Sequence, residues 1–248
     1  METMAYLTTG AAALLFAGIF LAGGRIHPLR PLFRDRRSAV SFAAGMSGAY
    51  VFVHVMPELH GARQSFAESV SVALRYEGMA IYFLALVGFL VFYGLDHLLA
   101  RLRADAAEEE EGAAGPAFRV HVGGFAVYVL MVAYLLVRNL EETGPTLALF
   151  VVAMSCHFLG VDHSMRDEHG SAYQRVGRFV LAGAAVVGWG LGLLVPLPPY
   201  VLALLVSFVS GAVIVNSAIM ELPSDKDGRF VPFMLGGLLY GLILLPLG

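Results

Sequence analysis

The stretch SGAYVFVHVMPE (residues 47–58) and the stretch SGAVIVNSAIME (residues 210–221) share their first three residues and their final glutamate. The first belongs to the second of eight apolar stretches along the chain, and the other belongs to the seventh. Because four stretches lie between them, the two copies would cross a membrane in opposite directions. We interpret the pair as an inverted internal repeat, an arrangement typical of secondary transporters.

The composition is that of a membrane protein. Hydrophobic residues make up 58% of the chain, charged residues make up 14%, and the mean hydropathy is +0.74, which excludes an ordinary soluble domain. A helix needs ~20 residues to cross a bilayer, and the apolar stretches approach this length at Met4–Gly24, Ser38–Met56, Gly78–Leu99, Val122–Val137, Thr146–Val161, Phe179–Val195, Tyr200–Met220 and Phe230–Leu247. The sequence therefore predicts an all-α polytopic protein with eight transmembrane helices.

Basic residues are distributed unevenly between the connections. Most fall in alternate connections, at Arg25, Arg30, Arg34, Arg36, Arg37, Arg101, Arg103, Arg119, Arg166, Arg175, Arg178, Lys226 and Arg229. The other connections hold Arg63, Arg75 and Arg138. The positive-inside rule places the first set in the cytoplasm, so both termini are expected to be extracytoplasmic. The abundance of Arg, Ala and Gly favours a bacterial source, and with it a cell (inner) membrane location.

The connection over 101–117 divides the chain. Four consecutive glutamates (108–111) are followed there by small residues and Pro116, a composition typical of a flexible loop, cytoplasmic in this orientation. Three apolar stretches precede the loop (1–100), two follow it as a hairpin (118–165), and three complete the chain (174–248). We expect a single transmembrane domain over 1–248 with a 3+2+3 arrangement, in which spans 1–3 and 6–8 are the inverted repeats.

Ionisable side chains inside apolar stretches are costly, and we treat them as candidate functional residues. His54 and Glu58 are four positions apart, which places them on one face of a helix. An imidazole and a carboxylate suit borderline cations such as zinc. The alternative is a helix-end pair in contact with lipid headgroups.

The fifth apolar stretch holds a second group of candidates. His157 lies well inside the stretch, and Asp162 and His163 follow it toward the cytoplasmic end. The run Asp-Glu-His at 167–169 comes next, and we interpret it as a loop or as an exit funnel for cations. A histidine that is hydrogen-bonded between helices is the alternative reading of His157.

The seventh stretch adds Asn216 and Glu221. An amide is a weak ligand, but with a carboxylate it can complete a metal site. A buried asparagine that joins two helices is the equally favoured alternative. The single cysteine, Cys156, excludes a disulfide framework within the chain and a cysteine-based zinc cluster.

These features together resemble the ZIP (Zrt/Irt-like) family of divalent metal transporters. Residues 55–58 (VMPE) are similar to the leucine-leucine-proline-glutamate ending of that family's second helix, and residues 210–223 are similar to its seventh helix. The resemblance implies the eight-helix fold, a homodimer, and metal bound between the fourth and fifth helices, with His157 as the leading ligand of the fifth. The fourth stretch departs from the family, because its middle from Tyr128 to Val132 has no histidine.

We therefore expect a transporter whose substrate is a divalent cation of the zinc, iron or manganese class, moved toward the cytoplasm by alternating access. The expected metal-contacting residues are His54 and Glu58 at the outer entrance, His157 at the centre, Asp162 and His163 on the inner path, and Asn216 and Glu221 from the second repeat. No resident cofactor is expected. The expected partners are the metal ion, the lipid bilayer and a second copy of the chain, and nucleic acid is excluded because the basic residues are dispersed.

Two alternatives stay open. A relative with the same fold that does not transport would fit the altered fourth stretch. A membrane-embedded metal hydrolase would use three histidines, such as His54, His157 and His163, around one zinc ion. The predicted orientation places His54 and His163 on opposite sides of the membrane, which argues against the hydrolase. Motifs of soluble enzymes are absent, and we do not expect an enzyme.

Overall fold

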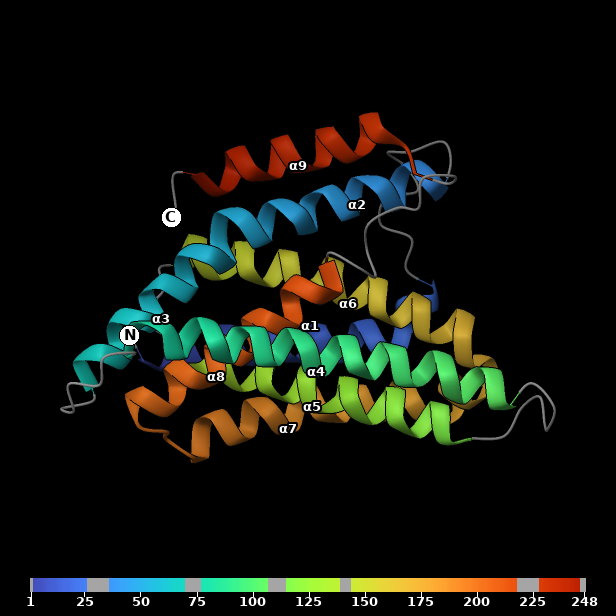
Figure 1. Ribbon diagram of the computed structural model, residues 1–248, viewed down its shortest axis with the longest axis horizontal. Helices are drawn as coiled ribbons and strands as arrows, with labels where there is room; N and C mark the ends of the chain where they lie inside the picture. Colours follow the sequence, from blue (N-terminus) through green and yellow to red (C-terminus); the bar gives the residue numbers. More distant parts are fainter. Residues whose placement is uncertain are drawn as a thin grey trace. The chain divides into compact units, whose positions relative to one another are not determined.

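The computed structural model describes residues 2–25, 36–69, 77–106, 115–138, 144–217 and 228–245, and within these segments all of the secondary structure is helical (Figure 1). The α-helices are α1 (Glu2–Ala22), α2 (Arg36–Tyr50), α3 (Met56–Ser69), α4 (Glu77–Ala106), α5 (Pro116–Arg138), α6 (Gly144–Ala172), α7 (Arg178–Leu194), α8 (Pro199–Val215) and α9 (Phe230–Leu244). A 3₁₀ turn, η1 (Gly23–Arg25), follows α1, and two π-helical turns, η2 (Val51–Val55) and η3 (Tyr173–Gly177), link α2 to α3 and α6 to α7.

Several of these helices are long and apolar enough to cross a membrane, which confirms the expected α-helical membrane protein. In the described residues, five helical stretches meet this condition: Ala5–Ala22, Arg37–Ser69, Met79–Leu102, Pro116–Arg138 and Leu147–Leu194. The last of these runs through α6 and α7, and α8 and α9 are shorter apolar helices. The division into eight spans in a 3+2+3 arrangement stays a prediction.

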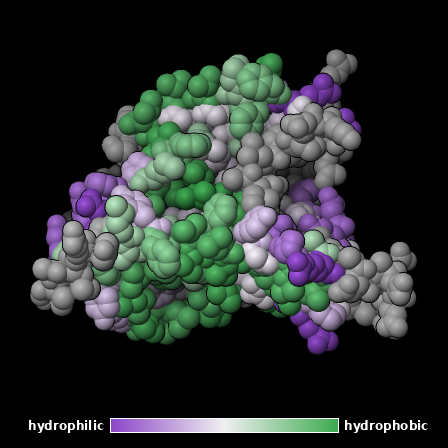
Figure 2. All heavy atoms as spheres, viewed as in Figure 1, coloured by the Kyte–Doolittle hydropathy of each residue, from purple (hydrophilic) through white to green (hydrophobic). Residues whose placement is uncertain are grey.

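Large apolar side chains are exposed along these helices, as a bilayer requires. Hydrophobic residues cover wide areas of the face in Figure 2. Among the exposed side chains are Leu14, Phe52, Phe83, Leu194, Phe230 and Leu242. In water such surfaces would drive association, whereas the hydrocarbon of a bilayer solvates them at no cost.

The chain divides into two compact units, and α4 and α6 each contribute to both. Unit 1 contains Met1–Ile26, Phe92–Gly144 and His157–Pro196, and unit 2 contains His27–Val91, Pro145–Cys156 and Leu197–Gly248. In unit 1, α7 packs against both α1 and α5. Aromatic rings fill the core of this unit: Phe16 and Phe158 meet edge to face with ring centroids 5.0 Å apart, and both are fully buried.

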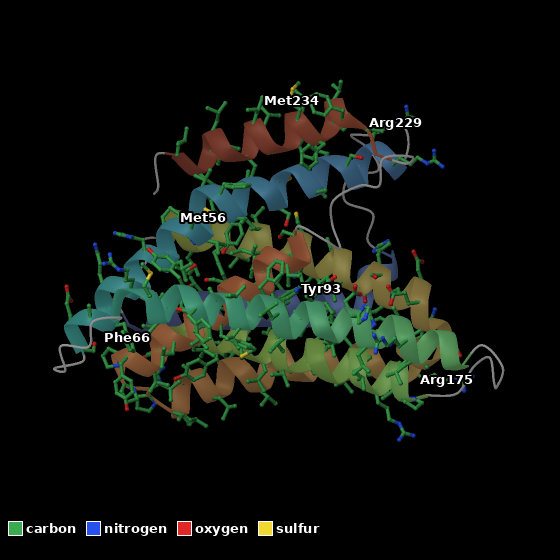
Figure 3. All side chains as sticks on the ribbon, viewed as in Figure 1. Met56, Phe66, Tyr93, Arg175, Arg229 and Met234 are labelled. Carbon is green, nitrogen blue, oxygen red and sulfur yellow. The ribbon has the colours of Figure 1, made fainter. Side chains whose placement is uncertain are left out.

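Glycines let the helix backbones of unit 2 approach each other closely. Helix α9 lies along α2 (Figure 1), where a Cβ atom on Gly45 would clash with the carbonyl oxygen of Phe233. The first half of α4 meets α8 in the same way, since a Cβ on Gly211 would clash with the carbonyl oxygen of Ala85. At the start of α9, the backbone N–H of Arg229 (labelled in Figure 3) donates to Ser41 Oγ at 3.0 Å. The second helix of each expected repeat thus packs against the third helix of the other.

The two repeated sequence stretches also share a local irregularity. The first contains the π-turn η2, where the N–H of Met56 donates to the carbonyl oxygen of Val51, and the second becomes π-helical at Asn216 and Ser217. The hydroxyl groups of Ser47 and Ser217 are 2.7 Å apart and join the two stretches. π-Helical turns cost helix stability and occur often at functional positions.

Candidate metal centre

Three potential metal ligands from two helices meet in unit 1. His121 lies in the second turn of α5, and Glu168 and His169 lie near the end of α6. His121 Nδ1 is 2.9 Å from His169 Nε2 and 3.3 Å from Glu168 Oε2. In the described part of the chain, this is the one set of three His, Cys, Asp or Glu side chains whose ligand atoms all lie within 4.8 Å of one another.

The spacing of these atoms suits a small divalent cation. Ligand atoms about 2.0–2.2 Å from a tetrahedral zinc ion are roughly 3.3–3.5 Å apart. His121 Nδ1 and Glu168 Oε2 already have this separation, and the two imidazoles would need to part by only a few tenths of an ångström. Two imidazoles and one carboxylate form a donor set used for zinc and for ferrous iron, with positions left for water or for a further ligand.

The surroundings of the centre are apolar on one side and open on the other. His121 is 2% exposed, whereas the Glu168 side chain is 26% exposed, so a hydrated cation can reach the carboxylate first. The ring of Phe125 meets the His121 ring edge to face, and Phe118 does the same for His169, each with centroids 5.4 Å apart. These aromatic contacts limit how far the two imidazoles can turn.

The helix that carries Glu168 and His169 is interrupted directly after them. Gly170 has φ 46° and ψ −118°, a left-handed conformation that favours glycine, and the π-turn η3 follows. Residues 167–169 are helical, in contrast to the loop expected from their charges. Because α6 continues up to Gly170, the consecutive residues Glu168 and His169 reach the neighbouring helix α5.

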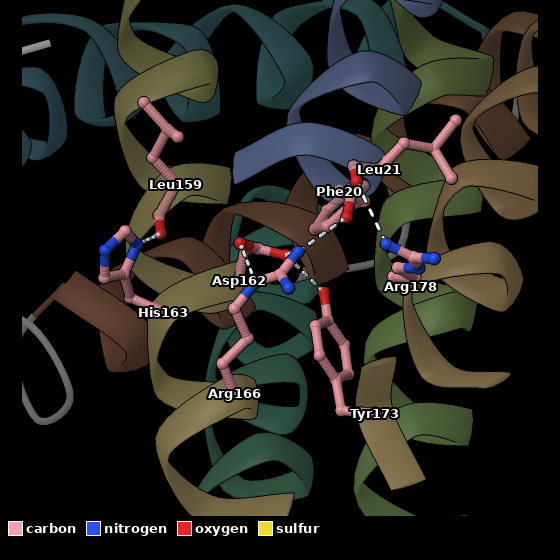
Figure 4. A network of polar contacts seen from close by, with 8 residues as sticks. All are labelled: Phe20, Leu21, Leu159, Asp162, His163, Arg166, Tyr173 and Arg178. Atoms are coloured by element: carbon pink, nitrogen blue, oxygen red, sulfur yellow. Dashed lines mark hydrogen bonds and ion pairs between the residues drawn. The ribbon is translucent and has the colours of Figure 1, made fainter. Parts of the chain in front are cut away.

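A second polar cluster lies one to two turns earlier on α6 (Figure 4). Arg166 donates from Nε to Asp162 Oδ2 at 2.7 Å and from Nη2 to Asp162 Oδ1 at 3.0 Å. Tyr173 donates its hydroxyl to Asp162 Oδ1 at 2.7 Å. Arg166 also donates to the carbonyl oxygen of Phe20 at 3.1 Å, near the end of α1. The carboxylate of Asp162 is therefore shared among protein donors in this structure.

The other two candidates on α6 lie apart from the three-ligand set. His157 is 5% exposed, and its ring meets that of Tyr128 on α5 edge to face with centroids 5.7 Å apart. His163 points its Nδ1 toward the carbonyl oxygen of Leu159, at 3.2 Å, one turn earlier on the same helix (Figure 4). His157 thus faces the same neighbouring helix as Glu168 and His169.

The remaining candidates belong to unit 2 or lie outside the described residues. His54 is in the π-turn η2, and its ring stacks on that of Tyr50 with centroids 5.0 Å apart. Glu58 is in the first turn of α3. Asn216 is 3% exposed, and its Nδ2 atom has no hydrogen-bond partner among the residues that the structure describes. Glu221 lies outside the described residues.

The centre was not predicted as a unit from the sequence. His121 is not among the predicted candidates. It directly precedes the fourth apolar stretch, where a polar residue is expected to lie at the membrane interface. The sequence places Glu168 and His169 in a charged run, for which a loop or an exit funnel is expected. One signal was available: His121 and the run at 167–169 both lie at the end of a span that the positive-inside rule assigns to the cytoplasm.

Comparison of the chain with models of protein families, with curated proteins and with solved structures finds no match. The similarity to the ZIP family therefore rests on the sequence features given above. The function of the centre has to be argued from its own chemistry.

Proposed function

We propose that this protein is an integral membrane transporter of divalent transition-metal cations, and that His121, Glu168 and His169 bind the cation during transport. The observation that carries this proposal is the convergence of two imidazole nitrogens and a carboxylate oxygen from two helices. Burial of ionisable groups in membrane helices costs free energy. Three such groups that converge on one point are best explained by a cation that binds there during transport.

The donor set favours particular metals. Imidazole nitrogen suits zinc and ferrous iron, whereas magnesium and calcium prefer sites made of oxygen atoms alone. Because His121 and His169 supply two nitrogens to one oxygen from Glu168, we expect zinc or ferrous iron as the preferred substrate. Manganese binds a given site of nitrogen and oxygen ligands less tightly than ferrous iron or zinc does, so we expect it to be the poorer substrate.

The position along α5 and α6 supports a role on the cytoplasmic side. The positive-inside rule assigns the connection before α5 to the cytoplasm, and His121 is in the second turn of that helix. His157 precedes Glu168 on α6, and at a rise of about 1.5 Å per residue it lies about 16 Å deeper along the helix than Glu168. We infer that His157 is a deeper station, that His121, Glu168 and His169 form the release station, and that the cation moves along the α5–α6 face between them.

The packing within unit 2 supports a mechanism in which the two three-helix repeats move against each other. The contact of α2 with α9 and the contact of α8 with α4 are equivalent if two three-helix repeats are related by an approximate two-fold axis. Alternating access in transporters uses such repeats, which rock against each other around the binding site. Movement toward the cytoplasm is the direction that the ZIP resemblance implies.

Uptake of metal into proteoliposomes tests the proposal. Purified full-length protein is reconstituted, and zinc, ferrous iron, manganese and calcium are offered to the wild type and to His121→Ala. We expect zinc and iron uptake by the wild type and a fall of at least about tenfold in the variant, because one of three ligands is lost.

The matched control is His60→Ala, which removes an exposed histidine on α3. It should transport like the wild type. Zinc binding without any uptake would favour the non-transporting relative, and equal uptake by wild type and His121→Ala would refute the role assigned to the centre.

A further inference from the structure

The two carboxylate oxygens of Glu168 have different neighbours. Its Oε2 atom lies 3.3 Å from His121 Nδ1, on the side of the two imidazoles. Its Oε1 atom accepts a hydrogen bond of 2.7 Å from the hydroxyl group of Ser164. One oxygen therefore faces the metal-binding position, and the other is held by a donor of the protein.

The hydrogen bond from Ser164 is local to α6. Ser164 precedes Glu168 by four positions, so helical geometry alone places the hydroxyl next to the carboxylate. The arrangement does not depend on the approach of α5 or on a bound cation. Ser164 is thus available to orient the carboxylate before the metal arrives.

We propose that Ser164 is a positioning residue that keeps Glu168 a one-oxygen ligand and thereby makes the centre selective for small, four-coordinate cations over larger ones. This inference rests on the proposed metal-binding function. With one carboxylate oxygen and two imidazoles, the protein offers three donors, and a water molecule completes the tetrahedral shell of zinc.

The same restriction disfavours manganese. Manganese prefers six ligands, mostly oxygen, and a carboxylate that binds through both oxygens helps to supply them. While Ser164 holds Oε1, the rotation of the Glu168 carboxylate is restrained, and turning both oxygens toward one cation bends or breaks this hydrogen bond. Loss of the hydroxyl should therefore weaken zinc binding, through a less ordered ligand, and leave manganese binding unchanged or stronger.

Equilibrium binding of zinc and of manganese to the purified full-length chain tests this. The variants are Ser164→Ala and the matched pair Ser164→Thr and Ser164→Val, which have nearly the same shape and differ in the hydroxyl. We expect Ser164→Ala and Ser164→Val to lose about tenfold or more in zinc affinity, the usual effect of removing a partner of a metal ligand. Ser164→Thr should keep the preference for zinc over manganese.

Ser171→Ala, which removes an exposed serine of the same helix, is the control and should bind both metals like the wild type. If Ser164→Ala folds poorly, the Thr and Val variants still isolate the hydroxyl. An unchanged ratio of zinc to manganese affinity in Ser164→Val, with normal zinc binding by the wild type, overturns this inference alone. Absence of zinc binding by the wild type overturns the proposed function instead.

Discussion

His121 Nδ1 and His169 Nε2 lie 2.9 Å apart, although the two residues are 48 positions apart in the chain. Either nitrogen can donate the hydrogen bond, depending on the tautomers of the two rings. A metal bound by both nitrogens needs a lone pair on each, so the ring that donates in this hydrogen bond has to take its other tautomer. The contact therefore brings the two nitrogens together before a cation binds.

Zinc binding should weaken as the pH falls. Both imidazoles must offer a lone pair to the metal, so protons compete with zinc for the nitrogens of His121 and His169. We expect the zinc affinity of the full-length protein to be lower at acidic than at neutral pH, measured by competition with a metal indicator. In the double variant His121→Ala/His169→Ala, the residual affinity should depend on pH much less. The same dependence in the double variant would assign the effect to other groups.

Asp162→Asn should destabilise unit 1 strongly. The carboxylate is fully buried and holds Arg166 and Tyr173, and its neutralisation leaves the partly buried guanidinium of Arg166 without its counter-charge. Breaking a buried pair by removing one partner typically costs about 3–5 kcal/mol. Thermal unfolding of the detergent-solubilised protein measures the effect.

The control for this substitution is Asp96→Asn, at an exposed position of α4 in the same unit. Its unfolding temperature should stay close to that of the wild type. If both variants unfold like the wild type, the cluster of Asp162, Arg166 and Tyr173 does not stabilise the end of α6, and Asp162 becomes available again as a metal ligand.

Gly45→Ala should be harmful, whereas Gly48→Ala should be tolerated, although both residues lie on α2. A Cβ at Gly45 meets the backbone of α9 at Phe233, and a Cβ at Gly48 meets no atom within 4 Å. Overpacking of a close helix contact costs about 1–3 kcal/mol. We expect a lower unfolding temperature for Gly45→Ala alone, and the same temperature for both variants would contradict the close packing of α2 on α9.

The helices followed from the sequence more readily than the centre did. Long apolar runs such as Met4–Gly24 and Gly78–Leu99 predicted helices because a bilayer demands satisfied backbone hydrogen bonds, and both runs are helical where the structure describes them. The length of α6 was underestimated, since charged residues at 167–169 suggested a loop. A charged side chain can lie within a helix when a residue one turn away satisfies it, as the hydroxyl of Ser164 does for Glu168.

The pairing of residues across helices could not be read from one sequence. His121 meets Glu168 and His169 because α5 and α6 pack in a particular register, and hydrophobic periodicity gives the face of a helix but not its partner's register. The sequence predicts Asp162 as a metal contact, whereas the structure pairs it with Arg166, four positions further along the same helix. The expectation that Asp162, His163 and His157 contact the metal remains a prediction.

X-ray absorption at the zinc edge, on full-length protein loaded with one equivalent of zinc, tests the central claim most directly. We predict a first shell of nitrogen and oxygen at about 2.0–2.1 Å, with outer-shell scattering from two imidazoles. His169→Ala should show one imidazole fewer, and His60→Ala should match the wild type. A wild-type spectrum with no imidazole scattering, or one that His169→Ala leaves unchanged, would contradict a metal centre formed by His121, Glu168 and His169.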